Sequence, residues 1–110
     1  LMPNSLINYL LNKKRINTGS MKRARIAVHG IVQGVFFRVN TAKAARELGL
    51  KGYAKNMPDG SVEIVAEGPK DKIDELIEFC KKSPGASEVS KIDVKFGKAK
   101  NEFGGFEVKR

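Results

Sequence analysis

The stretch ARIAVHGIVQGVFFRVNTAKAARELG, residues 24–49, joins a predicted strand to a predicted helix through a glycine-containing turn. Its first part alternates, with Ile26 and Val28 on one face, and ends at a glycine, which predicts a strand over 24–30. Its second part predicts a helix over 37–48, closed by a C-terminal glycine. Apolar and small residues recur there at helical spacing, namely Phe37, Thr41, Ala44, Ala45 and Leu48.

The rest of the chain predicts a hairpin, a second helix and two further strands, over residues 51–68, 69–82, 88–96 and 105–110. The hairpin turns at Pro58-Asp59-Gly60, where the proline fixes φ and the glycine can adopt a positive φ. The second helix carries one apolar stripe, formed by Ile73, Leu76, Ile77 and Cys80. The last two stretches alternate apolar and polar residues, as strands with one buried face do.

This order of elements predicts an α+β fold, β-α-β-β-α-β, with one short extra strand near the C-terminus. Two right-handed split crossovers that interleave give a mostly antiparallel sheet with two helices on one face, which is the ferredoxin-like sandwich. The four strands of that core are expected in the spatial order 4-1-3-2. Because this fold serves many functions, the function has to be argued from the residues of a site.

Composition limits the class of protein further. The chain has 110 residues and no apolar run near the roughly 18 residues that cross a bilayer, so a single soluble domain is expected. One cysteine, Cys80, excludes an internal disulfide and fits a reducing cytoplasm, and a single histidine, His29, leaves too few ligands for a zinc site. A net charge of +9 favours anionic partners but does not choose among small phosphates, nucleic acid and membrane surfaces.

Residues 1–20 differ in composition from the rest. They contain no acidic residue, and their three basic residues are adjacent, at Lys13, Lys14 and Arg15. Apolar residues recur there at helical spacing, which permits a short amphipathic helix, but such terminal segments contribute little to a fold. We therefore expect a dispensable extension over 1–20, disordered or left over from cloning, and a single domain over 21–110.

The turn between the first strand and the first helix is the strongest candidate site. A helix that starts directly after a strand leaves its first backbone N–H groups without partners, and these groups carry the positive end of the helix dipole. Gly34 would let the backbone approach a phosphate, and Arg38 in the first turn could direct its guanidinium at the same oxygens. Taken alone this pattern is weak, because glycine turns before helices are common and an arginine there is usually only solvated.

Asn56 is a second candidate, at the end of the first hairpin strand. By itself, an asparagine just before a Pro-Asp-Gly turn is most simply a turn-forming residue. Together, however, the motifs VHGIVQGVFFR at 28–38 and GYAKNMPDGSVEIVAEG at 52–68 resemble the acylphosphatase family, and the similarity runs from about residue 24 to the C-terminal GGFEVKR. Tyr53 stands where that family usually has tryptophan, and residues 1–20 lie outside the resemblance.

The resemblance implies a small hydrolase of carboxyl-phosphate anhydrides that needs no metal and no other cofactor. It implies that Arg38 and the loop amides bind the phosphate and that Asn56 orients the attacking water. The implied phosphate-binding residues are Gln33, Gly34, Val35, Phe36, Phe37 and Arg38. Small-molecule acyl phosphates would be the substrates, and inorganic phosphate and sulfate would compete with them.

The chemistry of an acyl phosphate agrees with this residue set. Its leaving group is a carboxylate with a pKa of about 4 to 5, so a general acid adds little and no catalytic histidine is required. Phosphoryl transfer mainly requires positioning and charge stabilisation on the phosphate oxygens, which one arginine and several N–H groups can provide. A neutral amide at position 56 can hold water, whereas a carboxylate there would repel the dianion. His29 and Cys80 are accordingly interpreted as structural residues.

Two other functions use the same order of elements. One is an RNA-binding module, and KGYA at 51–54 begins like its aromatic strand motif, but Lys55 and Asn56 follow where a second aromatic residue is needed. Nucleic acid is therefore not expected as a partner, nor is a membrane. The other is a regulatory or carbamoyl-phosphate-handling module of a larger enzyme, similar to the N-terminal domain of a hydrogenase-maturation carbamoyltransferase. A free-standing monomer is the simpler expectation, and the many charged residues suggest a heat-tolerant source.

Overall fold

The computed structural model describes residues 21–110, and the predicted extension over 1–20 lies outside the described residues. Within this range the elements follow in the order β1 (Met21–Ile31), α2 (Phe37–Glu47), β2 (Lys51–Asn56), β3 (Val62–Pro69), α3 (Lys70–Lys81), β4 (Glu88–Lys98) and β5 (Phe106–Lys109). Every element predicted from the sequence is therefore present, and the ends differ by a few residues at most.

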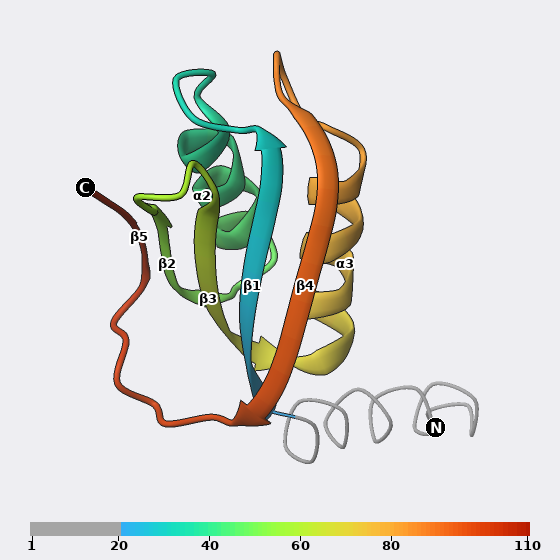
Figure 1. Ribbon diagram of the computed structural model, residues 1–110. Helices are drawn as coiled ribbons and strands as arrows, with labels where there is room; N and C mark the ends of the chain where they lie inside the picture. Colours follow the sequence, from blue (N-terminus) through green and yellow to red (C-terminus); the bar gives the residue numbers. More distant parts are fainter. Residues whose placement is uncertain (1–20) are drawn as a thin grey trace, which may run out of the picture.

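The strands form one sheet in the order β4-β1-β3-β2-β5, and both helices pack on one of its faces (Figure 1). Neighbouring strands are antiparallel except β2 and β5, which run parallel. The first four strands have the predicted order, so the ferredoxin-like α+β fold is confirmed, and the extra strand lies along the outer side of β2. Because β1 and β2 both run antiparallel to β3, their C-terminal ends reach the same edge of the sheet.

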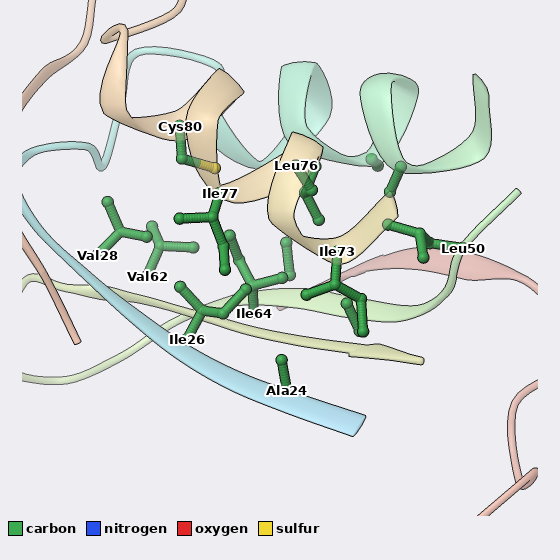
Figure 2. Close-up of a cluster of buried hydrophobic side chains, with 14 of the residues drawn as sticks. Ala24, Ile26, Val28, Leu50, Val62, Ile64, Ile73, Leu76, Ile77 and Cys80 are labelled. Atoms are coloured by element: carbon green, nitrogen blue, oxygen red, sulfur yellow. The ribbon is translucent and has the colours of Figure 1, made fainter. Parts of the chain in front are cut away.

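The hydrophobic core lies between the sheet and the helices, where β1 and β3 face α3 (Figure 2). All four residues of the stripe predicted on α3 are buried. The predicted face of α2 omits Ala42, which is fully buried, and includes Ala44 and Leu48, which are partly buried and pack against the core. The helix starts at Phe37, and its buried face follows the spacing i, i+4, i+5 and i+8, which leaves Ala44 at the edge of that face.

The face of the sheet away from the helices carries charged side chains, and hydrogen bonds to Glu67 hold the loop that leads to β5. Glu67 is nearly buried and accepts hydrogen bonds from Arg23 Nη1 at 3.1 Å and from the backbone N–H groups of Lys100 and Asn101, both at 2.9 Å. These contacts hold the segment 99–105 across the sheet. They thereby direct β5 to its place beside β2, which matters for the site described next.

Candidate active site

The loop between β1 and α2 leads into a helix start whose first backbone N–H groups lack acceptors within the helix. Gly34 and Phe36 both have left-handed backbones, with φ of 76° and 58°, and no described side chain caps the helix. The N–H of Asn40 donates to the carbonyl of Phe36 at 3.0 Å, so the N–H groups of residues 37–39 have no acceptor within the helix. The first turn also contains no acidic residue. The loop therefore offers several donors and the positive end of a helix to an anion.

These donors border a cavity of about 300 Å³. It is lined by Val32, Gly34, Phe36, Phe37, Arg38 and Val39, of which Arg38 alone is charged. Phe37 is buried in the core and can offer only its backbone N–H, whereas Phe36 is 77% exposed. Val35 packs against the core from the other side of the loop. The cavity is thus electropositive, with apolar side chains at its rim.

The guanidinium of Arg38 is held by β5. Its Nη1 donates a hydrogen bond to the carbonyl oxygen of Lys109. In the ladder between β2 and β5, Lys109 lies opposite Lys55, the residue that precedes Asn56. The Arg38 side chain therefore reaches from the first turn of α2 to the end of β2, where the second predicted site residue lies. This contact joins residues far apart in the sequence, and the sequence pattern gave no sign of it.

Asn56 ends β2, and its side chain is unusual for a turn-forming residue. Its Oδ1 is buried and has no hydrogen-bond partner among the described residues. Leaving a buried acceptor unpartnered costs stability, so such groups in folded proteins call for an explanation, and one explanation is a bound ligand or water. A purely turn-forming role does not account for this unpartnered oxygen.

Gln33 connects the loop to the turn that follows Asn56. Its Nε2 donates to the carbonyl oxygens of Met57 at 2.8 Å and Ser61 at 2.9 Å. The loop that carries Arg38 and the turn that carries Asn56 are thus held together by one side chain. Because the Gln33 amide is used in this way, its predicted contact with phosphate is left to the backbone N–H. The family resemblance included Gln33 among the site residues, but the sequence did not predict that its side chain bridges the loop and the turn.

The turn itself is closed by Asp59. Its Oδ1 accepts from the backbone N–H of Ser61 at 2.9 Å and from the Ser61 hydroxyl at 2.6 Å. These hydrogen bonds lower the pKa of the Asp59 carboxyl below its usual value, and the bond from the Ser61 hydroxyl has the larger effect. The turn after Asn56 is therefore ordered by an ionised aspartate on one side and by Gln33 on the other.

The two residues interpreted as structural differ in position: Cys80 lies in the core, whereas His29 lines a surface pocket together with Asp59 and Ser61 of the turn. Cys80 is buried in the core, and burial raises the pKa of its thiol to about 12, so it is an unreactive core residue as predicted. His29 lies on the face of the sheet away from the helices with its Nε2 3.4 Å from Asp93 Oδ2 of β4, a partner that the sequence spacing did not indicate. Within residues 21–110, no group of three or more His, Cys, Asp or Glu residues could hold a metal ion, and no helix is long and apolar enough to cross a membrane.

Fold and site together define a class of protein. It is a small α+β domain with an anion-binding loop at the start of its first helix, and it has an arginine and an asparagine held close to that loop. Such a site suits a small phosphorylated molecule.

Comparison with known proteins identifies the family. The acylphosphatase family model matches residues 24–108. An acylphosphatase of Aeropyrum pernix is 46% identical over 91 residues, which are 82% of this chain and 90% of that protein. The crystal structure of an acylphosphatase from Bacillus subtilis matches with a TM-score of 0.77 at 35% identity, covering 81% of this chain and 99% of the other. The chain belongs to the acylphosphatase family.

One structural relative is much longer than this chain. The crystal structure of full-length HypF, in a phosphate- and nucleotide-bound form, matches with a TM-score of 0.76 at 29% identity, covering 83% of this chain and 12% of HypF. The same fold therefore also occurs as a small part of a larger protein. The comparisons confirm the predicted family and the predicted class of enzyme, an acylphosphatase acting on acyl phosphates. The roles of the individual residues stay predictions.

Proposed function

We propose that Arg38 and the backbone N–H groups of residues 33–38 bind the phosphate of an acyl phosphate, and that Asn56 orients the water that attacks it. The observation that carries this proposal is the buried Oδ1 of Asn56, which has no partner among the described residues and precedes a turn that Gln33 holds against the loop. The neutral side-chain amide of Asn56 would hold the water and direct the water oxygen at phosphorus. The P–O bond to the acyl group then breaks, and the products are a carboxylate and dihydrogen phosphate.

The remaining residues supply what this reaction needs. Negative charge on the transferring phosphoryl oxygens is stabilised by the Arg38 guanidinium and the loop amides, which are fixed before the substrate arrives. The leaving carboxylate is weakly basic and departs without a proton donor. Because the donors are all protein groups, we expect hydrolysis to continue at the same rate in EDTA, and strong inhibition by EDTA that magnesium reverses would reject this mechanism.

Kinetics of two variants test the assigned roles. Arg38 contacts phosphate in both the ground and transition states, so Arg38→Ala should raise KM, lower kcat, and reduce kcat/KM by at least about 10³-fold. Lysine at this position should restore only part of the activity, because it lacks the planar guanidinium group with its paired N–H donors. Asn56→Ala should lower kcat to a similar degree while KM changes less than about threefold, since it acts on the water alone. Asn56→Asp should be worse than alanine, because its charge faces the dianion.

Arg46 offers a matched control for Arg38. It lies on the same helix and also donates to a carbonyl of β5, from Nε to Phe106 at 3.0 Å, but at the end of α2 away from the loop. Arg46→Ala should therefore keep the catalytic constants of the parent. Full activity of a folded Asn56→Ala variant, or unchanged phosphate affinity in Arg38→Ala, would contradict the proposed roles.

We further propose that the protein is a cytoplasmic monomer from a heat-tolerant source, that it does not bind nucleic acid, and that residues 1–20 are dispensable. Against nucleic acid binding, the ring of Tyr53 is already covered: Phe103 packs against it at a centroid distance of 6.0 Å, and Lys109 Nζ lies 4.2 Å from its centroid. Deleting residues 1–20 should change activity less than about twofold. Sedimentation, a melting curve and an RNA mobility shift test the other statements.

A further inference from the structure

The rim of the candidate active site exposes apolar side chains that the phosphate chemistry does not use. Phe36 is 77% exposed and Val39 53%, and both line the cavity that contains Arg38. Exposed single apolar residues are ordinary, but two that line one cavity beside a guanidinium are a localised feature. Within the described residues, Phe36 takes part in neither the aromatic pair nor the cation–π contacts.

The backbone of Phe36 adds a second, independent observation. Its φ of 58° and ψ of 21° are left-handed, a conformation that glycine and asparagine adopt readily and bulky side chains rarely do. A phenylalanine here therefore carries a strained backbone and a largely exposed ring. Strain of this kind is characteristic of sites that act on a ligand.

The in-line geometry of phosphoryl transfer indicates where the acyl group lies relative to these side chains. In phosphoryl transfer the attacking water and the leaving group lie roughly in line, on opposite sides of phosphorus. Asn56, the proposed water-orienting residue, is not among the residues that line the cavity, whereas Phe36 and Val39 are. With the phosphate held in the cavity by its loop donors, a leaving group in line with a water at Asn56 would point away from Asn56, toward the side chains at the cavity rim. The cavity volume of about 300 Å³ is at the lower end for small-ligand pockets, which leaves space beyond that of a phosphate.

We propose that Phe36 and Val39 form a subsite for the acyl group, so that this enzyme prefers acyl phosphates with an aromatic or extended apolar acyl group over those with a small one. This inference rests on the proposed function, since it assigns the leaving-group side of the same site. The Phe36 ring stacks on or packs against the acyl group, and Val39 of the first helical turn contacts it from the other side of the rim. Acetyl and carbamoyl phosphates are too small to use these contacts.

Two substrates and three proteins test the subsite. The ratio of kcat/KM for benzoyl phosphate to that for acetyl phosphate is measured, which cancels effects of a substitution on the phosphate itself. Phe36→Asn is the test variant, because asparagine tolerates the left-handed backbone and removes the apolar ring. Ile31→Asn is the control, because Ile31 is 54% exposed but does not line the cavity.

We expect the parent to prefer benzoyl phosphate, and Phe36→Asn to lower the ratio about tenfold, the scale of one lost apolar contact in a specificity pocket. Ile31→Asn should keep the ratio of the parent. A parent that hydrolyses both substrates with equal kcat/KM overturns the subsite and leaves the proposed function intact. A Phe36→Asn variant with the parent's ratio also overturns it. A parent that hydrolyses neither substrate overturns the proposed function, and the subsite falls with it.

Discussion

Replacing Gln33 with alanine removes a side chain that joins the phosphate loop to the turn after Asn56. Two hydrogen bonds are lost, to the carbonyl oxygens of Met57 and Ser61. At about 0.5–1.5 kcal/mol net for each, the free energy of unfolding should fall by about 1–3 kcal/mol. For a domain of this size that corresponds to a melting temperature lower by roughly 10 °C.

The same substitution should reduce turnover more than binding. Without the bridge the turn can shift, and a displacement on the order of 1 Å at a positioning group costs up to about 10²-fold in rate. We expect kcat of Gln33→Ala to fall by about 10- to 100-fold, with KM and phosphate inhibition changed less than about threefold, because Arg38 and the loop amides remain. Steady-state hydrolysis of benzoyl phosphate, measured well below the melting temperature, gives both constants.

A core variant separates the effect on the site from the effect on stability. Ile73→Val shortens a buried side chain of α3 and should cost about 1 kcal/mol while leaving kcat within about twofold. The reasoning is refuted if Gln33→Ala keeps the kcat of the parent. It is equally refuted if kcat falls as far in Ile73→Val as in Gln33→Ala. It is also refuted if Gln33→Ala weakens phosphate inhibition as strongly as it lowers kcat.

Three further predictions concern the structure around the site. Burial of Cys80, whose thiol pKa is about 12, should prevent its reaction with a disulfide reagent at pH 8 until the protein is unfolded; rapid reaction of the native protein would contradict this. The Asp59 carboxyl has a lowered pKa, so its contribution to stability is present above its ordinary pKa of 3.8 and is lost as the pH falls through the lower folded value. The difference in unfolding free energy between the parent and Asp59→Asn should therefore be larger at pH 6 than at pH 2, and a pH-independent difference would argue against the Ser61 contacts. Gly52→Ala should cost at least about 3 kcal/mol in urea unfolding, because its Cβ would lie 1.8 Å from the Val65 carbonyl oxygen, whereas Gly49→Ala, with open space around it, should cost about 1 kcal/mol.

The fold could be predicted because its information is local. Alternation along the strands and the stripe on α3 are properties of neighbouring residues, and together they fix which faces are buried. The incomplete prediction for α2 has the same origin. In a helix rich in alanine, Ala42 and Ala44 are chemically equivalent, and only packing against the sheet distinguishes them.

The candidate site was predictable as a set of residues but not as an arrangement. Spacing and family resemblance indicated Arg38 and Asn56, yet the contacts that position them join distant segments: Arg38 to Lys109, and Gln33 to the turn at 57–61. The periodicity of apolar residues along the sequence does not predict such long-range polar contacts. The helical spacing did place Phe37 on the buried face, but nothing in the sequence indicated the left-handed backbone of Phe36 or its exposed ring.

The contact between Arg38 and Lys109 also has a consequence for the newly made protein, because 71 residues separate its partners. A ribosome that adds about 5–20 residues per second takes about 4–14 s to pass from one to the other. During that interval the loop and its helix can form, but the guanidinium has no carbonyl to hold it beside β2. This contact can therefore form only once β5 has left the ribosome, and if Arg38 acts as proposed, we expect a growing chain to be inactive until then.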